Sequence, residues 1–165
     1  GSAADAEHIV GELLKGFMKG RKLSKIDIDA IEKHYPGEGE RISKSLQKTI
    51  RAVSLTSHIA LITAFMNDVD PAFVFAQQLL GLGKANDTLI AISTSGNSEN
   101  IINACKIAKI HQIKVIALTG ETGGKIINHC DTAIRAPEKA VPLIQELHLP
   151  IYHALCAMLE VKLYS

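Results

Sequence analysis

The chain alternates short runs of apolar and β-branched residues with longer segments of helical periodicity. We predict the short runs to be β-strands, at residues 52–55, 87–93, 114–119 and 131–135. The stretches 89–92 and 115–118 are apolar at every position, which is typical of strands in a parallel sheet covered on both faces. This alternation predicts an α/β fold: a doubly wound parallel sheet flanked by helices, as in a flavodoxin-like three-layer sandwich.

Helical periodicity fills the rest of the chain. It predicts helices at about 4–19, 38–48, 59–65, 71–80, 98–111 and 143–164. A length of 165 residues with 47% hydrophobic residues suits a single domain, 1–165, with its own core. Residues 19–48 are rich in charged side chains and interrupted by Pro36, Gly37 and Gly39. We expect them to form an exposed helical arm or a lid.

The charge balance excludes several classes of partner. Lys and Arg number 18 against 17 Asp and Glu, a net charge of +1, so we expect no nucleic acid and no membrane among the partners. No apolar run approaches the roughly 20 residues that span a bilayer, and we expect a soluble, cytoplasmic protein. Cys105, Cys130 and Cys156 are odd in number and lack a C-x-x-C spacing, which favours buried thiols over disulfides or a thiolate zinc site.

The start of the chain is unusual for a parallel α/β protein. Gly1 and Ser2 run directly into an amphipathic helix with no strand before it. Two explanations stay open: an N-terminal strand and helix are missing from this sequence, or Gly1 and Ser2 are a remnant of an expression vector.

A serine-rich turn, Ser93-Thr-Ser-Gly-Asn-Ser98, follows the most apolar predicted strand and precedes a helix. Free backbone N–H groups and the helix dipole favour an anion at such a place, and the hydroxyls add donors. Ser98 is also a candidate N-cap. An ordinary capped turn is the alternative interpretation. Neither G-x-x-x-x-G-K-[ST] nor G-x-G-x-x-G is present, so a sugar phosphate is favoured over a nucleotide.

Two pairs of polar residues are candidates for metal binding or acid–base chemistry. His8 and Glu12 are four residues apart and share one helix face, where they could chelate a metal or form an ordinary surface ion pair. Gln145 and His153 are eight residues apart, about 12 Å along a straight helix, whereas ligands of one zinc ion lie about 2 Å from it. If both bind a metal, we expect a site shared between subunits, with His153 from a neighbouring copy, although Pro150 could kink the helix.

Together these segments resemble the sugar isomerase (SIS) domain of the phosphoheptose isomerase family over nearly the whole chain. The resemblance rests on residues 1–13, 93–98, 118–125 and 144–153. The chain departs from the family pattern at Pro142, where an acidic residue is common, and at Gly16, where a basic residue is expected.

The resemblance implies a set of roles. One zinc ion per site would be bound by His8, Glu12, Gln145 and His153. Glu12 and His153 would be the acid–base pair of catalysis. The substrate would contact Gly1, Ser2, Glu12, Asn67, Asp68, Ser93, Thr94, Ser95, Ser98 and Gln145.

The resemblance also implies a reaction. It is the conversion of sedoheptulose 7-phosphate to D-glycero-D-manno-heptose 7-phosphate, in a homotetramer with sites shared between subunits. A carboxylate and an imidazole suit such an aldose–ketose shift, because it moves a carbon-bound proton and a hydroxyl proton. The alternative is a non-catalytic SIS module that binds a sugar phosphate for regulation or protein bridging. The presence of both Glu12 and His153 favours the enzyme.

Overall fold

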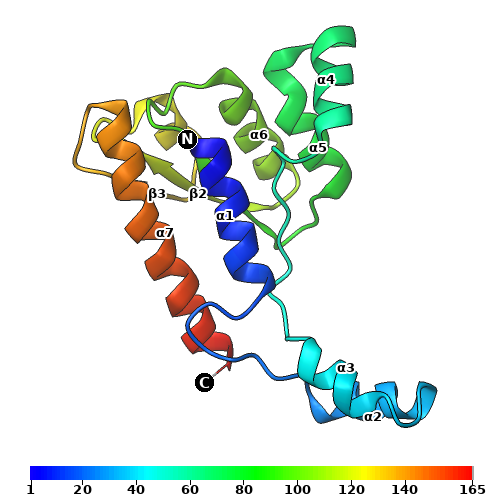
Figure 1. Ribbon diagram of the computed structural model, residues 1–165. Coiled ribbons are helices and arrows are strands. Elements are labelled where there is room, and N and C mark those ends of the chain that lie inside the picture. Colours follow the sequence, from blue (N-terminus) through cyan, green and yellow to red (C-terminus); the bar gives the residue numbers. More distant parts are fainter. Residues whose placement is uncertain (165) are drawn as a thin grey trace. The chain divides into compact units, whose positions relative to one another are not determined.

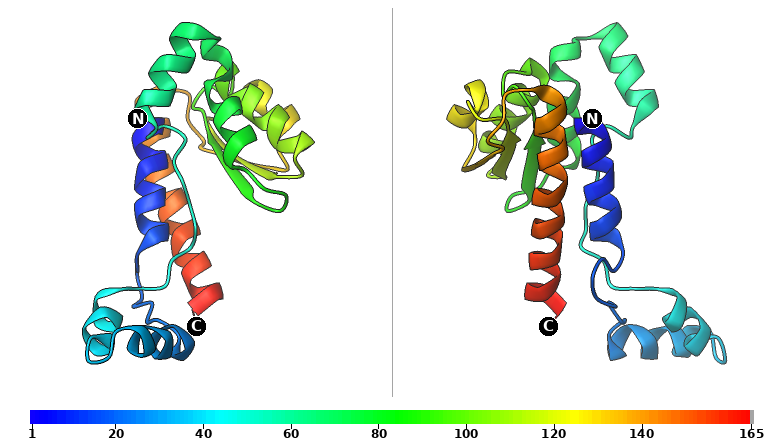
Figure 2. Two further views of the ribbon diagram at one scale, coloured as in Figure 1. Left: turned by 90° about the vertical axis from the view of Figure 1, so that its right-hand side faces the viewer. Right: turned by 60° about the vertical axis from the view of Figure 1, so that its left-hand side comes forward.

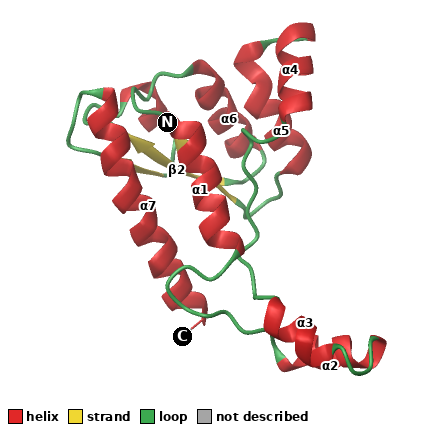
Figure 3. Ribbon diagram, in the orientation of Figure 1, coloured by secondary structure: helices red, strands yellow, loops and turns green. Residues whose placement is uncertain are grey.

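The computed structural model describes residues 1–164 and shows a mixed helix and sheet protein (Figures 1 and 3). Its elements in chain order are α1 (Ser2–Leu14), α2 (Lys25–His34), α3 (Gly39–Ser45), α4 (Ile59–Asp68), η1 (Pro71–Phe73), α5 (Val74–Leu82), β1 (Thr88–Ile92), α6 (Glu99–Ile110), β2 (Lys114–Thr119), η2 (Gly124–His129), β3 (Thr132–Arg135) and α7 (Val141–Tyr164). The chain forms two compact units. One contains Gly1–Glu7 and Ser54–Pro150, and the other contains His8–Val53 and the chain from Ile151 onward.

The sheet of the first unit has three parallel strands in the order β1-β2-β3. The register pairs Leu89 with Val115 and Ala117 with Ala133. Parallel neighbours need a crossover, and α6 provides the one between β1 and β2. The predicted fold class, a parallel sheet flanked by helices, is confirmed. Three of the four predicted strands form within two residues of their expected ends.

The strand predicted at 52–55 is wrong, because this segment forms no strand in the structure. Its hydroxyl groups make a local turn instead. The Ser54 side chain lies 2.7 Å from the Thr56 hydroxyl and accepts the Thr56 backbone N–H at 3.2 Å. Such local side-chain bonds compete with strand pairing.

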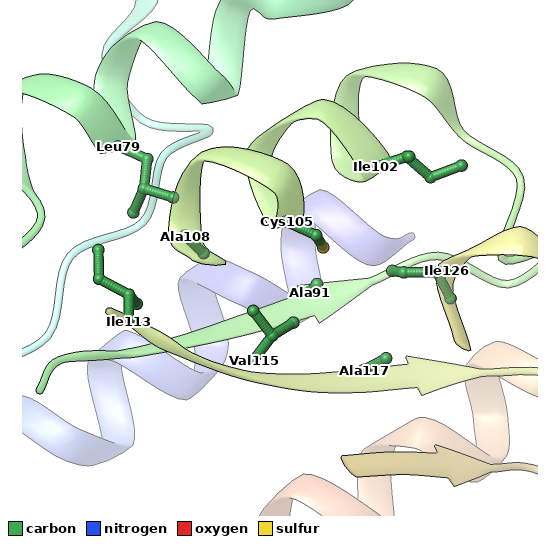
Figure 4. Close-up of a cluster of buried hydrophobic side chains, with 9 residues drawn as sticks. All are labelled: Leu79, Ala91, Ile102, Cys105, Ala108, Ile113, Val115, Ala117 and Ile126. Atoms are coloured by element: carbon green, nitrogen blue, oxygen red, sulfur yellow. The ribbon is translucent and has the colours of Figure 1, made fainter. Parts of the chain in front are cut away.

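The core of the first unit lies between the sheet and α6 (Figure 4). Small residues on α6 let the helix approach the strands closely, and aliphatic side chains fill the remaining space. The cluster consists of Leu79, Ala91, Ile102, Cys105, Ala108, Ile113, Val115, Ala117 and Ile126. Cys105 is fully buried and unpaired, and burial raises the pKa of its thiol to about 12. The interpretation of Cys105 as a buried apolar residue is therefore confirmed.

The first half of α7, which belongs to the same unit, lies on the other side of the sheet from α6 (Figure 2). Ile144 and His148 on this half are buried. The Nε2 atom of His148 lies 3.2 Å from the carbonyl oxygen of Thr119, the last residue of β2. This contact anchors α7 at the carboxyl end of the sheet, which is where α/β folds place their ligands.

In the second unit, a buried ion pair follows the end of α1. Sequence periodicity predicts this helix to about residue 19, but it ends at Leu14. The Glu160 carboxylate explains the difference, since it accepts the backbone N–H groups of Phe17, Met18 and Lys19 at 2.7–2.9 Å. These N–H groups are thereby removed from helical pairing.

The charged segment 19–48 contains α2 and α3, which accords with the predicted helical arm. Sequence periodicity predicts only the second of these helices. Ser24 and Asp27 form a capping box at the start of α2, a signal that marks a helix N-terminus. No residue of α2 is buried. Within the described residues, no helix is both long and apolar enough to cross a membrane.

Candidate functional site

The serine-rich loop lies between the end of β1 and the start of α6, as the sequence predicts. Ser93 is buried and its hydroxyl lies 3.1 Å from that of Ser98. Ser98 is the N-cap residue of α6, but its side chain makes no capping hydrogen bond to the helix. The Ile101 N–H in the first turn donates to Asn100 Oδ1 at 2.9 Å. The N–H groups before it therefore remain available to an anion together with the hydroxyls.

Glycines let this loop pack against the turn that follows β2. Gly96 has φ +63°, a left-handed conformation, and a Cβ there would overlap the carbonyl oxygen of Gly123. Two backbone hydrogen bonds join this loop to the turn after β2. Gly120 N–H donates to Thr94 O at 2.9 Å, and Ile126 N–H donates to Gly96 O at 2.9 Å. The two loops that carry the family resemblance thus form one rigid structure at the carboxyl edge of the sheet.

The first residue of the chain lies against Gln145. A Cβ at Gly1 would overlap the side-chain amide of Gln145, so the backbone of residue 1 lies directly against this side chain. The family resemblance implies that both residues contact substrate, and the structure brings them together. Of the other candidates in this unit, Ser2 opens α1, and Asn67 and Asp68 form the exposed end of α4.

His8 and Glu12 form a close pair on α1 in the second unit. Nε2 of His8 lies 3.2 Å from Oε1 of Glu12, and Lys15 Nζ lies 3.0 Å from the other carboxylate oxygen. Burial would raise the pKa of the Glu12 carboxyl, but the hydrogen bond and charge of Lys15, together with His8, outweigh this and hold the pKa below its usual range. Glu12 is therefore ionised at neutral pH and can accept a proton.

His153 on α7 completes this cluster. The ring centroids of His8 and His153 are 5.1 Å apart, in an edge-to-face arrangement. The Nε2 atom of His153 is buried and has no hydrogen-bond partner within the described residues. The contact between His8 and His153 lies within one chain, and whether Gln145 and His153 of one chain serve the same site stays a prediction.

The cluster is not arranged as a complete metal site. Within residues 1–164, no group of three or more His, Cys, Asp or Glu side chains has the geometry to hold an ion. His8 and Glu12 instead hydrogen-bond each other. The donor types still suit zinc, because imidazole nitrogens and a carboxylate are its usual ligands in catalytic sites, and the unpartnered Nε2 of His153 is a free donor atom of that kind.

Three residues that contact or support this cluster are not predicted from the sequence. The hydroxyl of Tyr152 lies 2.9 Å from Nδ1 of His8, and Arg21 forms a fully buried ion pair with Glu160. No spacing or motif singles out Arg21 or Glu160, because their partners come from segments far apart in the chain. Tyr152 could have been noticed only as the neighbour of His153.

A cavity of about 600 Å³ lies elsewhere in the first unit, beside α4 and α5. Its walls include His58, Leu61 and Leu82, and none of the predicted site residues lines it. This cavity therefore adds nothing to the candidate site.

Comparisons with known proteins agree with the fold. The SIS domain family matches residues 47–161. The phosphoheptose isomerase of a Nitratiruptor species is 38% identical over 160 residues, covering 97% of this chain and 72% of the relative. The phosphoheptose isomerase of Aneurinibacillus thermoaerophilus is 37% identical over 164 residues, covering 99% of this chain and 70% of the relative.

Solved structures give the same result. Phosphoheptose isomerase GmhA from Neisseria gonorrhoeae superposes with a TM-score of 0.74 at 33% identity, over 97% of this chain and 71% of that one. A phosphoheptose isomerase from Francisella tularensis gives a TM-score of 0.74 at 32% identity, over 95% and 71%.

The parallel sheet with its serine-rich loop thus defines a SIS domain. Within that class, the chain belongs to the phosphoheptose isomerase family. It is an isomerase, and the non-catalytic module considered above is not favoured.

Proposed function

We propose that this protein converts sedoheptulose 7-phosphate to D-glycero-D-manno-heptose 7-phosphate through an enediolate. The observation that carries the proposal is the cluster of Glu12, His8 and His153, an ionised carboxylate beside two imidazoles. It occurs in a chain whose relatives are named phosphoheptose isomerases. A non-catalytic module would need no such cluster.

Glu12 is the proposed base. Its carboxylate would take a proton from carbon 1 of the ketose and return it to carbon 2, which forms the aldose. Lys15 keeps the carboxylate ionised between turnovers by its contact at 3.0 Å. General-base catalysis of this kind contributes about 10²- to 10⁴-fold to a rate.

His153 is the proposed partner of Glu12. Its imidazole would carry the second proton of the reaction between the oxygens on carbons 2 and 1, since an imidazole gains and loses a proton near neutral pH. Its buried, unpartnered Nε2 atom is suited to this exchange. His153 and Glu12 together would balance the reaction, one moving the carbon-bound proton and the other the hydroxyl proton.

We propose a zinc site with His8, Glu12 and His153 as ligands, together with Gln145, which the family resemblance implies as the fourth. A bound zinc ion would supply a positive charge to stabilise the enediolate oxygens. Ligation would replace the present hydrogen bond between His8 and Glu12. The support is the chemistry of the donor set and the unpartnered Nε2 of His153.

The loop from Ser93 to Ser98 is the proposed phosphate site. The hydroxyls of Ser93, Thr94, Ser95 and Ser98 and the N–H groups at the start of α6 would bind the phosphate oxygens. Gly1, Ser2, Asn67, Asp68 and Gln145 are the proposed contacts of the sugar, by the family resemblance. A homotetramer with sites shared between subunits and a cytoplasmic location complete the proposal.

The experiment is a substrate panel. Zinc-loaded protein would be incubated with sedoheptulose 7-phosphate and, separately, with fructose 6-phosphate, and aldose formation followed by mass spectrometry after borodeuteride reduction. We expect turnover of the heptulose phosphate only. Turnover of the six-carbon sugar alone would contradict the proposed substrate, and turnover of neither would contradict the proposed activity.

A further inference from the structure

Tyr152 contacts His8 at the nitrogen that faces away from Glu12. The tyrosine is 2% exposed, and its hydroxyl oxygen lies 2.9 Å from Nδ1 of His8. The two rings meet edge to face, with centroids 5.4 Å apart. The other nitrogen of His8, Nε2, lies 3.2 Å from the Glu12 carboxylate. Both ring nitrogens of His8 are therefore engaged, each by a different side chain.

A hydroxyl group can both donate and accept a hydrogen bond. When Nε2 carries the proton and donates to Glu12, the Tyr152 hydroxyl can donate to Nδ1. When Nε2 offers its lone pair, Nδ1 carries the proton and donates a hydrogen bond to the same hydroxyl oxygen. A carboxylate or a backbone carbonyl could only accept. The Tyr152 hydroxyl thus fits both tautomers of His8 without any movement of the ring.

Binding a metal through Nε2 requires this exchange of tautomers. In the structure, Nε2 faces a carboxylate oxygen, which favours a proton on Nε2. A metal ligand needs the lone pair at that atom, so the proton must leave Nε2 and Nδ1 must hold one. Partners of this second nitrogen fix the orientation and tautomer of metal-binding histidines, and their loss typically lowers metal affinity about 10- to 100-fold.

We propose that Tyr152 is a positioning residue that holds the His8 ring in one orientation in both the metal-free and the metal-bound protein. The proposal rests on the zinc site proposed above. Tyr152 lies next to His153 on α7, so the segment that supplies one proposed ligand also orients another. Its hydroxyl is the only group that the substitution Tyr152→Phe removes.

The test compares Tyr152→Phe with Tyr164→Phe. Tyr164 is a matched control because its hydroxyl also makes a hydrogen bond, to Thr49 O at 3.1 Å, away from His8. The dissociation constant for Zn²⁺ is measured on metal-free protein by competition with a chromophoric chelator. We expect it to rise about tenfold or more in Tyr152→Phe and to stay within about twofold of wild type in Tyr164→Phe.

Two further readouts separate positioning from mere packing. In metal-free protein, the imidazole ¹⁵N resonances of His8 are expected to be sharp in wild type and broadened in Tyr152→Phe by reorientation of the ring. Excess Zn²⁺ is expected to restore the turnover number of Tyr152→Phe toward that of wild type, which it would not do for a packing defect.

The outcomes distinguish this proposal from the proposed function. Equal Zn²⁺ affinities of wild type and Tyr152→Phe would overturn the role of Tyr152 alone. A wild-type protein that binds no Zn²⁺ would overturn both the zinc site and this proposal. Zinc binding that weakens as expected in Tyr152→Phe, in a protein without heptose isomerase activity, would uphold the role of Tyr152 and contradict the proposed reaction.

Discussion

Arg21 and Glu160 form an ion pair from which water is fully excluded, with Nε of Arg21 2.8 Å from the Glu160 carboxylate. The carboxylate also accepts three backbone N–H groups. The guanidinium donates to the carbonyls of Glu12 and Leu13 at 3.1 and 2.6 Å. This pair therefore joins the end of α1, which carries Glu12, to the end of α7 beyond His153.

The first prediction concerns the stability that this pair supplies. Replacing Glu160 by Gln leaves the Arg21 charge buried without its partner, which typically costs about 3–5 kcal/mol. Urea unfolding at pH 7 is expected to show a loss of that order. The control Glu40→Gln removes an exposed ion pair with Lys44 and should cost less than about 1 kcal/mol. Equal losses in the two variants would contradict the account.

The same pair predicts a pH dependence. Although burial alone would raise the Glu160 pKa, the hydrogen bonds from Phe17, Met18, Arg21 and Lys19 lower it from its ordinary value of 4.5 to about 2. A lowered folded-state pKa stabilises the protein above the unfolded value, and this stability is lost as the pH falls. The difference in unfolding free energy between wild type and Glu160→Gln should therefore shrink between about pH 4.5 and pH 2. A difference that stays constant across that range would contradict the assignment.

The next prediction concerns the proposed base. Glu12→Gln keeps the volume of the side chain but removes its ability to take a proton, so turnover is expected to fall about 10²- to 10⁴-fold or to vanish. Glu7→Gln, an exposed change on the same helix, is the control and should retain activity. Retained turnover in Glu12→Gln would refute the role of Glu12 as the base.

The metal content of Glu12→Gln must be measured with its activity. Zinc bound at the wild-type level, with turnover lost, would assign the loss to proton transfer. Loss of zinc together with activity would show that Glu12 acts as a ligand first.

The geometry of the phosphate loop makes a further prediction. Gly96→Ala introduces a Cβ that overlaps the Gly123 carbonyl at a left-handed φ, a conformation that costs other residues about 1–2 kcal/mol before any clash. We expect the KM for the sugar phosphate to rise about tenfold or more, since a lost hydrogen bond to a charged group costs about 1.5–3 kcal/mol. The turnover number should change less.

The control for this prediction is Gly81→Ala on α5. A Cβ at Gly81 meets no atom within 4 Å, and Ala is a better helix former than Gly by about 0.5–1 kcal/mol. Gly81→Ala should leave KM unchanged and the protein as stable or slightly more so. A KM as high in Gly81→Ala as in Gly96→Ala would count against the phosphate loop.

Much of the fold could be predicted because its signals are local. The apolar runs 89–92 and 115–118 lie in β1 and β2, and the loop from Ser93 to Ser98 lies where the strand pattern places it. The strand expected at 52–55 is absent because the Ser54 hydroxyl bonds within its own turn, and residue composition alone cannot distinguish these outcomes.

The site could be predicted only in part. The spacing of His8 and Glu12 placed them on one helix face, and their contact follows from that spacing. The meeting of His8 with Tyr152 and the burial of Arg21 with Glu160 join segments more than 130 residues apart. No local pattern encodes such contacts, since they depend on how whole helices pack.

Proton NMR of sedoheptulose 7-phosphate in deuterated buffer, with the zinc-loaded protein, tests the proposed isomerase reaction directly. We expect aldose signals to appear and deuterium to enter at carbon 2, because the proton on Glu12 would exchange with solvent during the enediolate step. Formation of no aldose and no deuterium incorporation, in a protein that still binds the sugar phosphate, would contradict the isomerase.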